Sequence, residues 1–384
     1  MRAVSTPQQE HARGWTVGRV AGAPIILTPS MLVLAVVLTL VVTPSIRSQA
    51  PELGGGIYLV AAAFVVLLLA SVLVHEIAHG VVARARGQQP FEFVLTLWGG
   101  HTSFGGLAPT PATNALVAIV GPVANLVLAG AFLGLARVVD PWSVAALLLY
   151  SGAVTNGFVA VFNLLPGLPL DGGRVLEAVV WAVTGDRHRG TVAAAWVGRA
   201  VAVAVVAWVL AVPLVEGRSP DLFAVVWGVL IGGFLWSGAS ASLRGAQHGR
   251  AAEALTIDAV GTRAVAVAHT TSVAEAGAAA ATAGAAEVVL LSPDGRPAAY
   301  VDRASAAAVP PAQQPTTPVT SVAVALPGGA VVDASLSGRA LLEALAGALQ
   351  LSPVVVGLVD GRVVALVRTP DVVRALDPRA ARTA

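Results

Sequence analysis

Long apolar runs occupy the first two thirds of the chain. They cover residues 20–46, 53–74, 114–136, 141–165, 191–215 and 222–243. A helix needs about 20 mostly apolar residues to cross the hydrocarbon core of a bilayer. Only the fifth run contains a charge, Arg199, which we expect to snorkel toward the interface or to pair with a carboxylate. The pattern predicts six transmembrane helices.

A shorter apolar stretch, residues 91–106, is broken by glycine pairs and alternates in the manner of a strand hairpin. We expect its turn at Gly99-Gly100. Extended backbone at membrane depth is stable only where it packs on protein or lines a wet cavity. The segment is therefore predicted to be a re-entrant β-hairpin beside a functional site.

The composition agrees with a membrane protein. Hydrophobic residues make up 56% of the 384 positions and charged residues 11%, against about 25% charged in an ordinary soluble domain. A water-soluble globule and a disordered chain are poor fits, and a net charge of +2 gives no basic surface for nucleic acid. The absence of cysteine excludes disulfides, thiolate metal sites and cysteine nucleophiles.

The composition changes near residue 245, because all 8 Trp and all 9 Phe lie before it. We expect an N-terminal segment (1–19), a six-helix membrane domain (20–245), a soluble C-terminal domain (250–376) and a tail (377–384). With the N-terminus inside, ten arginines fall in cytoplasmic segments and three in outer loops. The positive-inside rule then predicts a multi-pass cell-membrane protein with both termini and the C-terminal domain in the cytoplasm.

The second apolar run leads into the sequence His75-Glu76-Ile77-Ala78-His79. On a helix, this H-E-x-x-H spacing places both imidazoles on one face, where they can bind one Zn²⁺ with Glu76 beside the metal-bound water. Ionisable residues within a membrane helix are costly and are functional by default. The alternative is a polar patch that contacts a neighbouring helix.

A catalytic zinc usually has three protein ligands, and without cysteine the third must be His, Asp or Glu. Asp171 is the best candidate, because it follows the fourth run in the sequence NLLPGLPLDGG, at the same predicted depth as the histidines. Pro166 and Pro169 interrupt the helix and can turn the carboxylate toward the metal. Taken alone, an Asp before Gly-Gly is more typical of a turn or a helix cap.

The sequences HEIAH, GPVAN (residues 121–125) and NLLPGLPLDGG together resemble the site-2 protease family of intramembrane zinc metalloproteases. The resemblance covers residues from about 20 to 245. It implies that His75, His79 and Asp171 bind one zinc ion and that Glu76 is the general base. It also implies cleavage of transmembrane segments of signalling proteins, such as anti-sigma factors or membrane-tethered regulators.

Three further polar residues are candidates for the site. Asn163 matches the Asn that precedes the proline-rich turn in the family, which implies contact with unwound substrate backbone. For Asn125, substrate contact and a helix–helix hydrogen bond are equally open. His101, in the expected hairpin, can approach the site or cap a turn, and we favour the second.

The C-terminal region contains a weak internal repeat with an offset of 66 residues, in which EVVLLSPDGR from residue 287 is echoed by PVVVGLVDGR from residue 353. Each copy shows an apolar strand, an Asp-Gly turn and a second strand, preceded by a helical stretch at 272–284 or 337–349. The pattern resembles a tandem CBS (cystathionine-β-synthase-type) pair, with repeats at about 252–308 and 316–376. The predicted fold is thus a polytopic α-helical membrane protein with an α/β CBS-pair domain.

CBS pairs commonly bind adenine nucleotides, and Asp371 is the residue that matches the nucleotide-binding pattern here. The rest of that pattern is poor, because Arg368 stands where Thr or Ser is expected. A structural pair, or one that forms a homodimer, is at least as well supported as a nucleotide sensor.

These features predict a zinc endopeptidase that acts within the membrane and contacts its lipid. The alternatives are a CBS-regulated transporter and a zinc-binding scaffold without protease activity. No inverted repeat of the spans supports a transporter, and an intact Glu76 argues against the scaffold.

Overall fold

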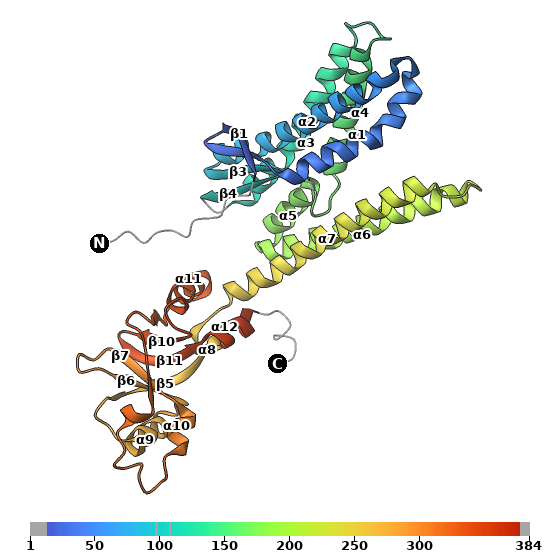
Figure 1. The fold of residues 1–384 in the computed structure, drawn as a ribbon. Helices are drawn as coiled ribbons and strands as arrows, with labels where there is room; N and C mark the ends of the chain where they lie inside the picture. Colours follow the sequence, from blue (N-terminus) through green and yellow to red (C-terminus); the bar gives the residue numbers. More distant parts are fainter. Residues whose placement is uncertain (1–13, 97–98, 107–108, 377–384) are drawn as a thin grey trace. The chain divides into compact units, whose positions relative to one another are not determined.

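The computed structural model describes residues 14–96, 99–106 and 109–376, with the backbone alone for 99–106. The chain divides into two compact units, Met1–Leu243 and Arg244–Ala384. The first unit contains a small sheet and most of the helical residues, and the second contains a larger sheet with short helices (Figure 1).

Six helices in the described residues are long and apolar enough to cross a membrane, which confirms the predicted number of spans. They are α1 (Pro29–Gln49), α2 (Ile57–Ala85), α3 (Pro111–Ala136), α4 (Val144–Asn163), α6 (Arg187–Val215) and α7 (Leu222–Glu253). The amphipathic helix α5 (Asp171–Thr184) lies between α4 and α6 in the chain, and the short 3₁₀ helix η1 (Pro51–Gly56) precedes α2.

A four-stranded sheet accompanies these helices, in the order β1 (Trp15–Val20), β2 (Ala23–Leu27), β3 (Gln88–Thr96) and β4 (Gly99–Gly106). The predicted hairpin is present as the antiparallel pair β3–β4, and β2 adds to it in parallel. Phe93 of β3 packs with Ile25 of β2 against Ile77 of α2. The sheet therefore rests on the helix that carries the H-E-x-x-H sequence (Figure 1).

Two details of the expected membrane domain are wrong. The first apolar run is not helical from residue 20, because Ala21 and Gly22 adopt positive φ and form the tight turn of the β1–β2 hairpin, so α1 begins at Pro29. Gly99 and Gly100 are not the turn of the second hairpin, because they pair with Thr96 and Leu95 as part of β4. The two residues between the paired strands, 97–98, lie outside the described residues.

The second unit is built on a seven-stranded sheet with the order β8-β7-β6-β5-β11-β10-β9. Its strands are β5 (Gly261–Ala268), β6 (Glu287–Leu291), β7 (Pro297–Val301), β8 (Ala323–Ala325), β9 (Val331–Asp333), β10 (Val354–Val359) and β11 (Arg362–Arg368). Its helices are α8 (Ile257–Val260), α9 (Val273–Ala283), α10 (Arg303–Ala308), η2 (Val319–Val322), α11 (Gly338–Leu349) and α12 (Thr369–Leu376).

The internal repeat is visible in this unit as two strand pairs, β6–β7 and β10–β11, each preceded by the predicted helix. Asp360 and Gly361 both have positive φ, as a two-residue hairpin turn requires. Ser272 and Glu275 form the capping box that begins α9. The two copies join where β5 pairs with both β6 and β11.

Candidate metal centre

Helix α2 carries His75, Glu76 and His79, all of which are buried. Because the two histidines are four residues apart, their rings lie on one face of the helix, with the Nε2 atoms 3.0 Å apart. Gly80 follows His79, and the ring of Phe93 occupies the space that a Cβ there would need. The packing of the sheet on α2 therefore depends on a glycine beside the second histidine.

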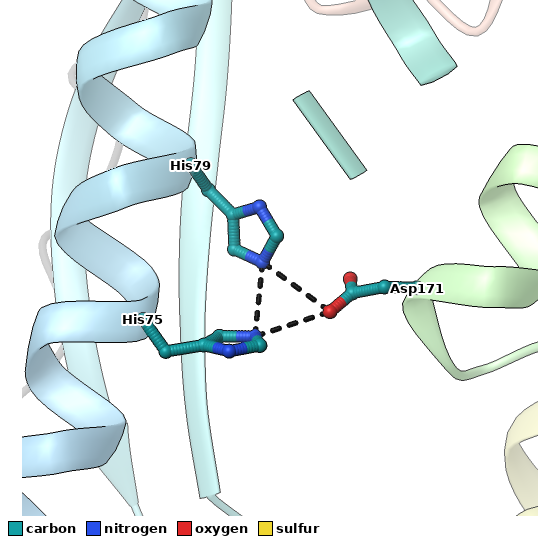
Figure 2. Close-up of side chains that lie close together, drawn as sticks. All are labelled: His75, His79 and Asp171. Carbon is teal, nitrogen blue, oxygen red and sulfur yellow. Dashed lines mark hydrogen bonds and ion pairs between the residues drawn. The ribbon is translucent and has the colours of Figure 1, made fainter. Parts of the chain in front are cut away.

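Asp171 approaches the same two nitrogens from a different part of the chain. Its Oδ2 lies 3.1 Å from His75 Nε2 and 3.4 Å from His79 Nε2. Figure 2 shows the two imidazoles on α2 facing the carboxylate at the start of α5. The distant segments that carry the two sequence motifs thus meet at one point.

The loop at 164–170 places this carboxylate. Helix α4 ends at Asn163, and α5 begins with Asp171 itself. A Cβ at Gly172 would lie 2.2 Å from the carbonyl oxygen of Leu164, and one at Gly173 would lie 2.2 Å from the nitrogen of Leu168. The Gly-Gly pair after Asp171 is therefore required for the loop to fold back on the first turn of α5.

Helix α6 supports the other side of this loop. The backbone N–H of Leu168 donates a hydrogen bond of 3.1 Å to the carbonyl of Ala194. A Cβ at Gly198 would lie 1.9 Å from the carbonyl oxygen of Leu168, so the loop and α6 meet backbone to backbone. Buried Glu177 of α5 accepts further bonds from Arg187 and Thr191 of α6.

The donor set fits a zinc ion. One ligand atom from each of His75, His79 and Asp171 lies within 4.8 Å of the others. Asp171 Oδ2 is a buried atom without a hydrogen-bond partner in the described part of the chain, and such a group needs a compensating interaction. Two imidazole nitrogens and one carboxylate oxygen are a typical ligand set for a catalytic zinc with an open fourth position.

The outer nitrogens of both imidazoles are fixed by helix α3. His79 Nδ1 lies 2.5 Å from the carbonyl oxygen of Val117, and His75 Nδ1 lies 2.5 Å from Asn125 Oδ1. A carbonyl oxygen can only accept, so His79 Nδ1 carries the proton. Its Nε2 lone pair is therefore directed at the metal position.

The same conclusion holds for His75, through a chain of buried amides. Asn156 Nδ2 donates 2.9 Å to the carbonyl of Gly152, which fixes the orientation of that amide. Asn156 Oδ1 then accepts from Asn125 Nδ2 at 2.7 Å, which leaves Asn125 Oδ1 to accept from His75. Asn156 Nδ2 also bonds Ser71 Oγ at 3.1 Å, so α2, α3 and α4 share one polar network.

The chain is similar to several known proteins. The model of peptidase family M50 matches residues 138–207. "Putative zinc metalloprotease Rip3" of Mycobacterium tuberculosis is 36% identical over 230 residues, which are 58% of this chain and 56% of that protein. The solved structure of a site-2 protease from Methanocaldococcus jannaschii aligns with a TM-score of 0.41 at 22% identity, over 60% of this chain and 94% of that one.

A shorter relative decides the family. "Putative zinc metalloprotease MJ0611" of Methanocaldococcus jannaschii is 31% identical over 147 residues, and these cover 75% of that protein. The chain belongs to the site-2 protease (M50) family. Together with the six apolar helices, this makes it a multi-pass membrane protein, as predicted. The M50 chain spans little more than half the length of Rip3.

The remaining predicted residues of this M50 protein are Asn163, His101 and Asp371. Asn163 is half-buried at the end of α4 and forms no side-chain hydrogen bond among the described residues. His101 pairs with Val94 through its backbone, and its side chain lies outside the described residues. Asp371 belongs to the other unit, in the first turn of α12, where Arg374 Nη1 contacts it at 3.3 Å.

Sequence reasoning missed two residues of the site. Asn156 is a lone amide in the fourth apolar run, and its polarity within a membrane helix was the available signal. Gly121 starts the GPVAN sequence, and a Cβ there would lie 2.4 Å from His79 Nε2 and 2.7 Å from His75 Cε1. Asn125, for which two roles were open, forms the helix–helix bond to Asn156 and also contacts His75.

Proposed function

We propose that this M50 protein is an intramembrane zinc endopeptidase that hydrolyses peptide bonds within the transmembrane segments of other proteins. The observation that carries the proposal is the convergence of His75, His79 and Asp171 from distant parts of the membrane unit. A zinc-binding scaffold would use the same three ligands but does not need Glu76, which is intact and buried next to His75.

His75, His79 and Asp171 would hold the zinc. When bound, Zn²⁺ supplies Lewis-acid activation of water at neutral pH. Glu76, buried next to His75 on α2, is the general base: its carboxylate accepts a proton from the attacking water and later returns it to the leaving amine. Asn163, the last residue of α4 before the loop that leads to Asp171, would bind unwound substrate backbone.

The substrates we propose are membrane-anchored signalling proteins such as anti-sigma factors or tethered regulators. The distribution of arginines supports an orientation with both termini in the cytoplasm. Products released on that side would be cytoplasmic fragments able to act as signals.

We further propose that the C-terminal unit is a tandem CBS pair that mediates homodimerisation. The repeated order of strand, helix, strand, strand and helix supports this assignment. A nucleotide at Asp371 is less well supported, because Arg368 makes a two-pronged ion pair with buried Glu287 at 3.0 and 3.1 Å. The Arg368 guanidinium therefore already has a carboxylate partner.

The test is elemental analysis of purified protein, run beside cleavage of a model transmembrane substrate. We expect about one zinc per chain in the wild type. Asp171→Ala should lose both zinc and cleavage, whereas Glu76→Gln should keep zinc and lose cleavage by a factor on the order of 10² to 10⁴. Wild-type protein that is well folded but holds no zinc and cleaves nothing would contradict the proposal and favour a transporter.

A further inference from the structure

Arg199 is a charged residue inside a membrane-spanning helix without a carboxylate partner among the described residues. Its Nε and Nη2 donate to one acceptor, Ser240 Oγ on α7, at 3.3 and 3.0 Å. A guanidinium has five N–H donors in a planar fork, so most of its donor capacity is unused. Of the two expectations from the sequence, pairing with a carboxylate is therefore not met.

Two tryptophans enclose the guanidinium. Its central carbon lies 4.9 Å from the ring centroid of Trp196 and 4.9 Å from that of Trp236. The two indoles are 58% and 46% exposed, so they lie on the outer surface of the α6–α7 pair. Cation–π contacts hold the cation in place but do not neutralise its charge.

The position of Arg199 along α6 matches the edge of the hydrocarbon core. Residues 200–215 carry no charge and extend about 24 Å as a helix, followed by Glu216, Arg218 and Asp221 in the loop to α7. A hydrocarbon core is about 30 Å thick, so the Cα of Arg199 lies roughly 6 Å inside the opposite boundary. An arginine side chain spans that distance, and tryptophan is the residue that favours this level of the bilayer.

We propose that Arg199, Trp196, Trp236 and Ser240 form a binding site for the phosphate of an anionic phospholipid. The planar fork of arginine matches two phosphate oxygens, and such charge-assisted bonds strengthen where water is scarce. The exposed indoles lie where the glycerol and upper acyl chain of the lipid would pack. None of these four residues is a proposed zinc ligand, and occupancy of the lipid site does not require peptidase activity.

The experiment measures lipid retention by the full-length protein in native mass spectrometry, with dioleoyl-phosphatidylglycerol and dioleoyl-phosphatidylcholine as competing probes. Phosphatidylcholine carries the same phosphate, but its choline ammonium offsets the negative charge. We therefore expect the wild type to retain the anionic lipid about tenfold better, which is about 1.4 kcal/mol. Arg199→Gln should abolish this preference. Arg199→Lys should keep part of it, because lysine retains the positive charge but lacks the planar guanidinium that bonds two phosphate oxygens. Arg137→Gln, a change at an exposed arginine after α3, is the matched control and should leave the preference intact.

Two further arms keep the proposal falsifiable. If Arg199→Gln fails to fold, Trp196→Leu retains the bond from Arg199 to Ser240 and should reduce the preference about threefold. Glycerol 3-phosphate, added without lipid, should not displace the bound phosphatidylglycerol. A wild type without the preference, an Arg199→Gln protein that keeps it, an Arg137→Gln protein that loses it, or displacement by the soluble phosphate would each overturn the proposal.

Discussion

Asn125 Oδ1 lies 2.5 Å from His75 Nδ1 and connects α2, the helix of the two candidate histidine ligands, to a chain of buried amides. The amide nitrogen of Asn125 is engaged as well, by Asn156 on α4. The carbonyl of Gly152 fixes the orientation of the Asn156 amide, which in turn fixes that of Asn125. The position of the proton on His75 therefore follows from a backbone atom through three hydrogen bonds. The packing of three membrane helices thus places a proton on His75 Nδ1.

The first prediction concerns this chain. Asn125→Ala removes the acceptor of His75 Nδ1, so the ring loses its fixed tautomer and orientation, and zinc affinity should fall by about 10- to 100-fold. Competition with a chelator of known affinity measures the change. Asn114→Ala is the control and should bind zinc normally. Asn114 lies near the start of α3, where its side chain bonds only the carbonyl of Arg174, at 3.4 Å, among the described residues. Equal affinities in the two variants would contradict the assigned role.

Gly121 gives a second prediction. The methyl group of Gly121→Ala would fall 2.4 Å from His79 Nε2, so the imidazoles must move away from the metal position. We expect zinc binding and cleavage to fall together, each by about tenfold or more. Gly130→Ala on the same helix is a matched control, because nothing lies within 4 Å of its added Cβ. Normal zinc content in Gly121→Ala would show that the space at this glycine is not needed for the site.

Metal removal gives the third prediction. A chelator should abolish cleavage while the membrane unit stays folded, because the bonds of His75 to Asn125 and of His79 to Val117 do not involve the metal. Circular dichroism and an unchanged elution volume would report the fold, and added Zn²⁺ should restore activity. Loss of helix content in step with zinc would show instead that the metal is structural.

The fourth prediction concerns the C-terminal unit. Glu287 is 2% exposed and its carboxylate raises the pKa of the Arg368 guanidinium through a two-pronged hydrogen bond. Among the described residues, Arg368→Ala leaves this buried carboxylate with Arg303 alone, at 3.8 Å, and should lower the local stability of β6 by about 2 kcal/mol. Hydrogen exchange of β6 amides in the full chain measures this.

The control for that experiment is Arg374→Ala. It breaks an ion pair with Asp371 on the surface, which contributes at most a few tenths of a kcal/mol. Unchanged exchange in β6 for Arg368→Ala would mean that Glu287 is satisfied without its arginine.

The sequence was sufficient for the parts of the site that follow from local spacing. His75 and His79 share a face because a helix turns every 3.6 residues, and Asp171 was found because the number of spans predicts its depth. Asn156 and Gly121 were missed because their roles depend on which helices pack together. A single sequence does not show which helices are neighbours. The β1–β2 hairpin was missed because an apolar, charge-free run is compatible with a buried strand as well as with a membrane helix.

The backbone contact between Leu168 and Gly198 has a consequence for motion. Asp171, the proposed third ligand, directly follows a loop whose backbone contacts the backbone of α6, whereas the two histidines are tied to α3 through Val117 and Asn125. A tilt or shift of α6 would therefore move Asp171 relative to the imidazoles. Arg199 follows Gly198 directly, so the residue that meets the lipid and the residue that supports the ligand loop are neighbours in the chain. A change in the bilayer that moves α6 at Arg199 would therefore also move the adjacent loop and change the position of Asp171 relative to the histidines.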